Sequence, residues 1–325
     1  MTPTYERREI AATGIMVTPV AMGCWPITGM TSVDVNRDDS LATLQAAFDA
    51  GINFFDTAYM YGANGESERM IAEVLGKHRD EIVIATKCGL HWDENLQRAF
   101  DGAPATLRRE CEESLRRLNT DRVELLYLHA PDPNCPLEES AGVLKELMEE
   151  GKTRSIGVSN FTVPQLEAFH RVCPISAFQP PFNMLQRQIE LDTLPWCRQR
   201  GVSTMVYWPL MKGLLAGRIP RDYQFAPDDG RAKYPMFQGD EFKRNQDFLD
   251  HLREVANAIG KTVAQVVVNW TLLRDGITVA LCGAKRAYQI EETAGAMGWE
   301  LTDAQLQKIA QALAQRGVPV VKPAV

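Results

Sequence analysis

Short, nearly continuous apolar runs recur along the chain and alternate with segments of helical periodicity. The apolar runs lie at residues 20–25, 53–58, 82–87, 123–129, 155–160, 177–181, 203–209 and 278–283. Runs of this kind predict strands of a parallel sheet that is covered on its outer side. Helices are predicted between them at residues 40–50, 67–77, 106–118, 137–149, 164–171, 189–200, 245–274 and 285–297. Eight strands alternating with eight helices predict an α/β fold that closes into a (β/α)8 TIM barrel.

Three segments lie outside this alternation of strands and helices. Alternating residues at 7–10 and 15–18, separated by a turn at Thr13-Gly14, predict an N-terminal β-hairpin. Residues 211–243 form a long loop after the seventh strand, and loops of that length are usually functional or mobile. Residues 302–315 predict an extra C-terminal helix. No repeat, low-complexity segment or linker divides the chain, so residues 1–325 are predicted to form a single domain.

Composition narrows the class of protein. The 325 residues are 45% hydrophobic and 24% charged, as in globular proteins, and the net charge of −7 argues against nucleic acid or an anionic membrane as the main partner. No apolar run approaches the roughly 20 residues that a membrane helix needs. Seven cysteines are scattered singly, without zinc-like spacing, so no metal site is predicted. Scattered free thiols indicate a reducing compartment and therefore a cytoplasmic protein.

Polar side chains follow several of the predicted strands. Alternation places Asp56 on the same face as Phe54, and an unpaired carboxylate there would be costly, so a cation should meet it. Lys87 and His129 end two other strands, and Tyr61 lies just beyond Asp56. Because the C-terminal ends of barrel strands share one rim, these four side chains should converge.

An Asp, Tyr, Lys and His set suits protonation of a carbonyl oxygen. Free tyrosine has a pKa of about 10, and a neighbouring ammonium should lower it. Asp56 can hold Lys87 in place beside Tyr61, while His129 orients the substrate. The set lacks a hydride source, so a cofactor would supply one. Taken singly, each residue can also be explained by a structural role. Asp56 would cap a strand, Lys87 would extend its ammonium to solvent, His129 would be a hydrogen-bonded core histidine and Tyr61 would serve in packing.

Several motifs extend this pattern along nearly the whole chain. They are GINFFDTAYMYG (51–62), IVIATK (82–87), DRVELLYLHAPDP (121–133), GKTRSIGVSNF (151–161), QPPFNMLQR (179–187), YWPLMKGLLAG (207–217) and GAKRAYQIEE (283–292). With them the chain resembles an aldo-keto reductase. The resemblance implies a catalytic tetrad of Asp56, Tyr61, Lys87 and His129, with Tyr61 as the acid for reduction.

The same resemblance implies a nicotinamide cofactor. Ser159, Asn160 and Gln179 would hold the carboxamide, and Tyr207 would stack on the ring. Further cofactor contacts would come from Trp208, Pro209, Leu210, Gly213, Leu214, Gly217, Gly283, Ala284, Lys285, Gln289 and Glu292.

The adenosine end of the cofactor is where this chain departs from the family pattern. A helix starting after Gly283 would offer free amides to phosphate, and Lys285 is the candidate 2′-phosphate contact, with Arg286 nearby. Gln289 stands where animal-type members often place arginine, and Thr293 where asparagine is usual. NADP is favoured, and NAD stays possible.

Three functions remain open for such a chain. The leading one is NADP-dependent reduction of an aldehyde or ketone. A redox-sensing regulatory subunit that binds the cofactor with little turnover is an alternative. A lyase or isomerase using Lys87 as a Schiff-base amine is disfavoured, because Asp56 would keep Lys87 charged. Trp25 and Trp92 are expected to wall the pocket, and aromatic walls with few cations favour a neutral small-molecule carbonyl.

Overall fold

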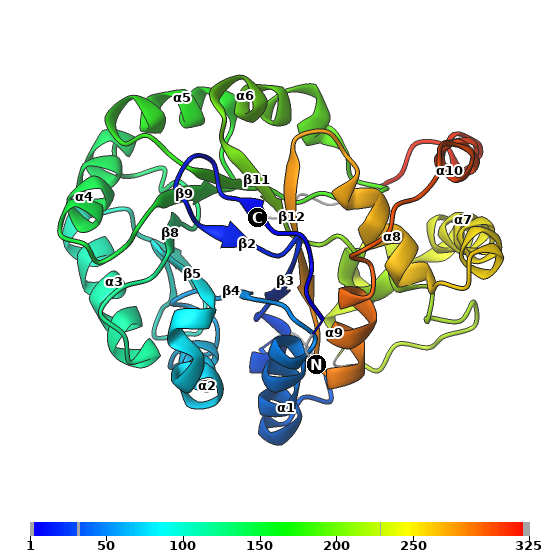
Figure 1. The fold of residues 1–325 in the computed structure, drawn as a ribbon, viewed down its shortest axis with the longest axis horizontal. Helices are drawn as coiled ribbons and strands as arrows, with labels where there is room; N and C mark the ends of the chain where they lie inside the picture. The colour runs from blue at the N-terminus through cyan, green and yellow to red at the C-terminus, as the bar shows by residue number, and fades with distance from the viewer. Residues whose placement is uncertain (1–2, 31–32, 228, 321–325) are drawn as a thin grey trace.

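Eight parallel strands close into a barrel in the computed structural model, which describes residues 3–30, 33–227 and 229–320 (Figure 1). Each strand pairs with the next one along the barrel, and the last pairs back with the first. In order they are β3 (Val20–Gly23), β4 (Phe54–Asp56), β5 (Val83–Cys88), β8 (Leu125–Leu128), β9 (Ile156–Ser159), β10 (Ala177–Gln179), β11 (Ser203–Val206) and β12 (Ile277–Gly283). The predicted TIM barrel is confirmed.

Helices surround this barrel (Figure 1). The ring consists of α1 (Arg37–Asp49), α2 (Glu66–Leu75), α3 (Pro104–Leu118), α4 (Leu137–Glu149), α5 (Val163–Val172), α6 (Thr193–Arg200), α8 (Val263–Leu272) and α9 (Ala287–Ala294). Two further helices, α7 (Gly239–Ala258) and α10 (Asp303–Arg316), lie together outside the ring. Their contact is polar as well as apolar, since the buried Arg316 donates to Asn245 and pairs with Glu241.

The helices predicted at residues 245–274 and 189–200 differ most from those observed. Residues 245–274 form two helices, because Gly260 adopts a left-handed φ of 64° and Thr262 caps a new helix by accepting from the Gln265 amide. Helix α6 begins at Thr193, where Asp192 caps it, and the four residues Gln188–Leu191 form a 3-10 turn instead.

The N-terminal hairpin, predicted from alternation, closes one end of the barrel. Strands β1 (Arg8–Glu9) and β2 (Met16–Val17) pair antiparallel. Ile10, Ile15 and Val17 are buried in one cluster with the inward-facing residues of the barrel strands. In Figure 1 this hairpin crosses the barrel opening that faces the viewer. It therefore leaves the opposite end, at the C-terminal ends of the strands, for a site.

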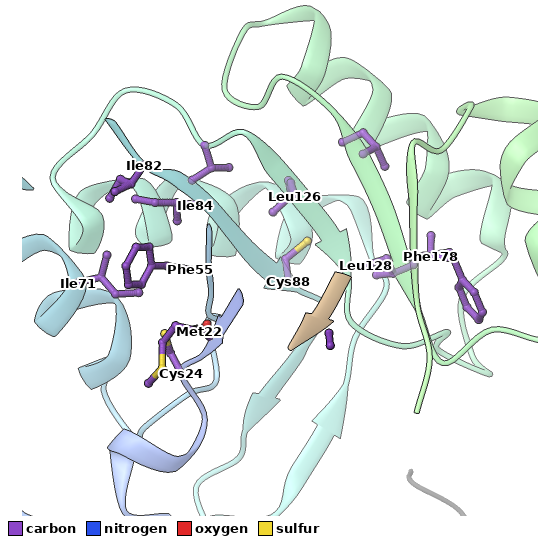
Figure 2. Close-up of a cluster of buried hydrophobic side chains, with 14 of the residues drawn as sticks. Met22, Cys24, Phe55, Ile71, Ile82, Ile84, Cys88, Leu126, Leu128 and Phe178 are labelled. Carbon is purple, nitrogen blue, oxygen red and sulfur yellow. Dashed lines mark hydrogen bonds between the residues drawn. The ribbon is translucent and has the colours of Figure 1, made fainter. Parts of the chain in front are cut away.

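Side chains alternate between the interior of the barrel and its outer surface. Phe54 belongs to the interior cluster, whereas Phe55 packs outward in a cluster with Ile71 of α2 (Figure 2). The interior is filled tightly: a Cβ on Gly157 would lie 2.5 Å from the Tyr127 ring and 2.9 Å from the Ala177 carbonyl oxygen. By the same alternation Asp56 shares the interior face with Phe54, as predicted.

A hairpin not predicted from the sequence follows β5. It consists of β6 (Leu90–Trp92) and β7 (Arg98–Phe100), which pair antiparallel. The described part of the long loop after β11 includes the 3-10 turns η4 (Met211–Ala216), η5 (Gly230–Lys233) and η6 (Pro235–Phe237), and it packs Leu214 and Phe237 into the core beside α7 and α8.

The seven cysteine thiols are free. Six are buried and Cys135 is partly exposed. Burial raises the pKa of the Cys173 thiol to about 11 and that of Cys111, Cys197 and Cys282 to about 12. None of the helices in the described part of the chain has the length and apolarity to span a bilayer.

Candidate active site

Asp56 and Lys87 form a buried ion pair at the C-terminal ends of neighbouring strands. The Lys87 Nζ donates to Asp56 Oδ1 at 2.6 Å, to the Thr57 carbonyl oxygen at 2.7 Å and to Tyr61 Oη at 3.3 Å. These three acceptors match the three N–H bonds of an ammonium group. The second oxygen of Asp56 accepts from Gln179 Nε2 at 2.8 Å. The cation predicted to meet Asp56 is therefore Lys87, and its position is fixed on every side.

Tyr61 lies in the loop after β4 with its hydroxyl beside this pair. Its ring meets the Trp25 ring edge-on at 5.0 Å and the His129 ring at 5.9 Å between centroids. Lys87 Nζ is 4.8 Å from the Tyr61 ring centroid. The four side chains predicted to converge at this rim do so.

Burial sets the protonation state of Tyr61. Burial by itself disfavours the Lys87 ammonium, but the Asp56 carboxylate and Tyr61 outweigh it, so the pKa of Lys87 is raised. Burial also raises the pKa of Tyr61, and the nearby Lys87 does not offset it. Lys87 lowers the pKa of Tyr61, as expected, but burial outweighs it and the Asp56 carboxylate also raises this pKa, so the net change is upward. Tyr61 is thus a protonated phenol at neutral pH.

His129 follows β8 and faces the same space. Burial, then the charges of Lys87 and Arg98, hold the pKa of His129 well below its usual range. Its Nδ1 is buried and has no hydrogen-bond partner among the described residues. The imidazole is therefore neutral, and the residue is partly exposed although Nδ1 itself is buried.

The residues predicted to hold a carboxamide form one hydrogen-bond network beside the ion pair. Ser159 Oγ donates to the Gln179 carbonyl oxygen at 2.7 Å. Asn160, with a left-handed φ of 64°, donates from Nδ2 to the His129 carbonyl oxygen at 3.1 Å and to Ser159 Oγ at 3.0 Å. Tyr207 Oη donates to Asn160 Oδ1 at 2.7 Å. These four side chains are brought together with their orientations fixed.

The network fits a primary carboxamide. Such a group needs acceptors for two N–H bonds and a donor for its oxygen, and each amide oxygen of the protein can accept twice. Asn160 Oδ1 accepts only from Tyr207 among the described residues. Gln179 Nε2 has a second N–H beyond the one given to Asp56, and its amide oxygen is a further acceptor. The donor set therefore suits a nicotinamide.

The predicted phosphate end lies where β12 leads into α9. Gly283 is closely packed, because a Cβ there would lie 2.8 Å from Pro26 Cγ, and the buried Ala284 follows it. Helix α9 starts only at Ala287, and Gln289 Oε1 accepts from the backbone amides of Lys285 and Arg286 at 2.8 and 3.2 Å. The expectation that these amides are free is thus wrong, since Gln289 caps the helix.

Cations gather at this end of the site. Lys285 Nζ donates to the Val33 carbonyl oxygen at 2.8 Å, and Arg286 donates to the Asp34 carbonyl oxygen at 2.6 Å. Burial, and after it the charge of Arg231 from the long loop, lower the pKa of Lys285. Arg231 pairs with Asp229 at 2.6 Å and Arg286 with Asp39 at 3.3 Å. Lys285 is therefore the cation here that has no carboxylate partner among the described residues, and it is suited to a phosphate group.

The loop after β11 is tied to α9. Arg218 pairs with Glu292 at 2.9 Å. Gly213 has a φ of 90°, and a Cβ there would lie 3.9 Å from Arg231, whereas a Cβ on Gly217 would crowd Val263 at 3.0 Å. Leu214 is fully buried, so its contribution is to packing. The remaining predicted contacts follow β11 directly, namely Trp208, Pro209 and Leu210.

The predicted pocket walls lie beside Tyr61. The Trp25 and Trp92 rings stack at 6.4 Å, and Trp92 Nε1 donates to the Met60 carbonyl oxygen at 2.8 Å. Trp92 belongs to the hairpin of β6 and β7, and a buried carboxylate anchors that hairpin. Glu110 accepts from the Gly89 amide at 2.7 Å and contacts His91 Nδ1 at 2.8 Å. The sequence offered a signal for Glu110, which lies three residues after Leu107 on the buried face of α3.

A second buried carboxylate, also not predicted, supports the loop that carries Tyr61. Glu68 of α2 accepts from Thr86 Oγ1 at 2.7 Å and pairs with Arg117 at 3.2 Å. Arg117 in turn donates to the Tyr59 carbonyl oxygen at 3.0 Å, and a Cβ on Gly65 would lie 2.6 Å from it. The loop between Asp56 and α2 thus rests on this pair. No group of three His, Cys, Asp or Glu side chains in the described ranges is placed to hold a metal ion.

The fold and this site define an oxidoreductase of one family. The model described as "Aldo/keto reductase family" matches residues 19–314, and the chain belongs to that family. It is 38% identical over 299 residues to the aldo-keto reductase YhdN of Bacillus subtilis strain 168, which covers 91% of this chain and 90% of that one. It is 30% identical to the NADH-specific methylglyoxal reductase of Escherichia coli strain K12, over 95% of this chain and 99% of that one. The structure of a glycerol dehydrogenase from Gluconobacter oxydans is also similar, with a TM-score of 0.90, 35% identity and 98% of each chain covered.

Proposed function

We propose that this aldo/keto reductase uses NADPH to reduce an aldehyde or ketone, with Tyr61 as the proton donor. The observation that carries the proposal is the threefold fixation of the Lys87 ammonium by Asp56, Thr57 and Tyr61. The Lys87 ammonium is therefore placed to stabilise the negative charge that develops on the Tyr61 oxygen as its proton leaves. The names of two relatives, a methylglyoxal reductase and a glycerol dehydrogenase, favour carbonyl and alcohol interconversion.

Each residue of the tetrad has one task in this mechanism. Asp56 keeps Lys87 charged and in place. Tyr61 Oη gives its proton to the carbonyl oxygen, and the neutral His129 orients that oxygen. NADPH, when bound, supplies the hydride. Ser159, Asn160, Gln179 and Tyr207 would hold its nicotinamide, and the closely packed aromatic rings of Trp25 and Trp92 would exclude water.

The proposal is tested by titrating the protein with NADPH and NADH while following protein fluorescence, and then measuring oxidation of the bound nucleotide with a panel of aldehydes. We expect tight binding of NADPH and turnover. Binding without turnover of any carbonyl would instead support a redox-sensing regulatory subunit. Failure of both nucleotides to bind would contradict the whole site assignment.

NADP is proposed over NAD because Lys285, which pairs with no carboxylate among the described residues, lies where β12 leads into α9, with Arg286 beside it. One relative is named NADH-specific, so the choice needs its own experiment. Lys285→Ala should weaken NADPH binding more than NADH binding, because only NADPH carries a 2′-phosphate. Lys308→Ala, an exposed lysine on α10, is the matched control. Equal effects of Lys285→Ala on both nucleotides would remove the support for a 2′-phosphate contact.

The free thiols also agree with a reducing compartment, and we propose the cytoplasm as the place of action.

A further inference from the structure

Arg98 lies on the face of the β6 and β7 hairpin that is turned toward the active site. In an antiparallel pair, directly opposite residues project to the same face. Arg98 is opposite Trp92, and Leu90 is opposite Phe100. His91, the intervening residue, points the other way and contacts the buried Glu110. Arg98 therefore shares a face with Trp92.

That face borders the catalytic tyrosine. Leu90 and Trp92 pack in one cluster with Met60 and Tyr61. Trp92 stacks on Trp25, which meets the Tyr61 ring at 5.0 Å. The positive charge of Arg98 acts on His129, because it is the third cause, after burial and the charge of Lys87, of the lowered pKa of His129. It also acts on Tyr207, whose pKa burial raises and Arg98 lowers.

The Arg98 guanidinium is exposed and has neither a hydrogen bond nor an ion pair within residues 3–30, 33–227 and 229–320. Asp93, the acidic residue at the start of the hairpin turn, uses Oδ1 to accept from the amides of Asn95 and Gln97, both at 2.8 Å. Lys87, in contrast, is buried and has all three N–H bonds engaged. Arg98 is thus a cation at the mouth of the site that is available to a ligand.

We propose that Arg98 selects carbonyl substrates that carry an anionic group, a carboxylate or a phosphate, and binds that group while the carbonyl lies at Tyr61. A guanidinium matches the geometry of both anions through paired N–H donors. This inference rests on the proposed reductase function and names its substrate class. It differs from the neutral carbonyl expected from the sequence, because the hairpin of β6 and β7 adds the charge of Arg98 to the aromatic walls.

The test compares aldehydes that share a carbon skeleton and differ in whether they carry an anionic group. With NADPH, kcat/KM is measured for succinic semialdehyde against butanal and for glyceraldehyde 3-phosphate against glyceraldehyde, which separates a carboxylate preference from a phosphate preference. We expect the wild type to prefer the anionic member of at least one pair. Arg98→Gln should lower kcat/KM for that member roughly tenfold or more, mainly through KM, and change the neutral member less than twofold.

Two further variants make the result specific. Arg98→Glu should reduce use of the anionic aldehyde further than Arg98→Gln does, because it adds repulsion. Arg171→Gln removes an exposed arginine at the end of α5, on the opposite face of the barrel, and should leave all four values unchanged. No preference in the wild type, or an equal loss on charged and neutral aldehydes in Arg98→Gln, would overturn the proposal.

A binding measurement separates this inference from the reductase proposal. The anion 4-hydroxybutyrate should quench the fluorescence of Trp25 and Trp92 in the wild type, with a Kd raised roughly tenfold in Arg98→Gln. Arg98-dependent binding without turnover would leave the anion site standing and contradict the reductase function. Turnover of butanal with equal 4-hydroxybutyrate affinity in both proteins would support the reductase function and overturn the role of Arg98.

Discussion

Single side chains in this site are distinguished by how many of their hydrogen-bonding groups are already used. Lys87 has its three donors engaged by Asp56, Thr57 and Tyr61, whereas Nδ1 of His129 lacks a partner in the described part of the chain. Lys87 is therefore held in place as a cation, whereas the His129 imidazole is neutral and partly exposed. The chemistry proposed for the site follows from this division.

Tyr61→Phe should abolish most reduction while cofactor binding is preserved, because only the proton donor is removed. General acid catalysis typically contributes roughly a hundredfold to ten-thousandfold, and kcat should fall within that range. Tyr59→Phe is the matched control, since the Tyr59 hydroxyl binds Glu113 and lies outside the tetrad. Unchanged turnover in Tyr61→Phe would overturn the assignment of the acid.

The pH dependence should differ between the two reaction directions. The pKa of Tyr61 is raised above its ordinary value of about 10 and that of His129 is well below its usual range, so both groups stay neutral from about pH 6 to 9. Reduction needs the protonated phenol, and its kcat should be flat over that interval. Alcohol oxidation needs the phenolate, and its kcat should rise toward tenfold per pH unit. A decline of reduction between pH 7 and 9 would show that the pKa of Tyr61 is lowered instead.

At the scale of elements, the site is held by contacts between neighbouring helices, strands and loops. The loop that carries Tyr61 rests on Arg117 of α3, which is paired with Glu68 of α2. The hairpin that carries Trp92 is anchored by Glu110 of α3. Helix α3 thus supports two separate walls of the same pocket.

Arg117→Gln should reduce both stability and catalysis. It leaves Glu68 buried without its ionic partner, which should cost about 3 kcal/mol in the free energy of unfolding. It also frees the Tyr59 carbonyl oxygen, and the resulting misplacement of Tyr61 should lower kcat roughly tenfold. Arg116→Gln, the exposed neighbour on the same helix, should change neither quantity appreciably. Urea denaturation and steady-state kinetics check the two effects, and a wild-type kcat in Arg117→Gln would contradict the support role.

The elements that the sequence predicted correctly are those with a local pattern. The barrel strands were visible as apolar runs, and Asp56 was visible as a carboxylate on the face of Phe54. The break at Gly260 was missed because helical periodicity continues on both sides of it. The hairpin of β6 and β7, and with it the position of Arg98, was missed because its turn at residues 93–97 has no glycine or proline, unlike the turn at Thr13-Gly14. The raised pKa of Tyr61 depends on burial by distant segments, which no local pattern contains.

At the scale of the whole molecule, α7 and α10 form a pair that lies outside the helical ring of the barrel (Figure 1). The barrel positions the proposed chemistry, while α7 and α10 lie outside its helical ring and are joined by Arg316, Asn245 and Glu241. A substitution in this outer contact should therefore lower the free energy of unfolding and change kcat little.

Arg316→Gln should lower the free energy of unfolding by about 3 kcal/mol, because it removes the buried partner of Glu241 and Asn245. Arg244→Gln removes the exposed partner of the same Glu241 and should cost less than about 1 kcal/mol. Urea denaturation measures both values. The kcat of folded Arg316→Gln should equal that of the wild type, and a large loss of kcat would show that α7 and α10 act on the site.

The distribution of the thiols makes the protein a natural subject for single-site labelling. A maleimide reacts with an accessible thiolate, and six of the seven cysteines are buried, with burial raising the pKa of their thiols. Cys135, in the segment between β8 and α4, is the partly exposed one. A dye attached there would sit at the C-terminal end of the barrel, where it would report ligand arrival without any engineered cysteine.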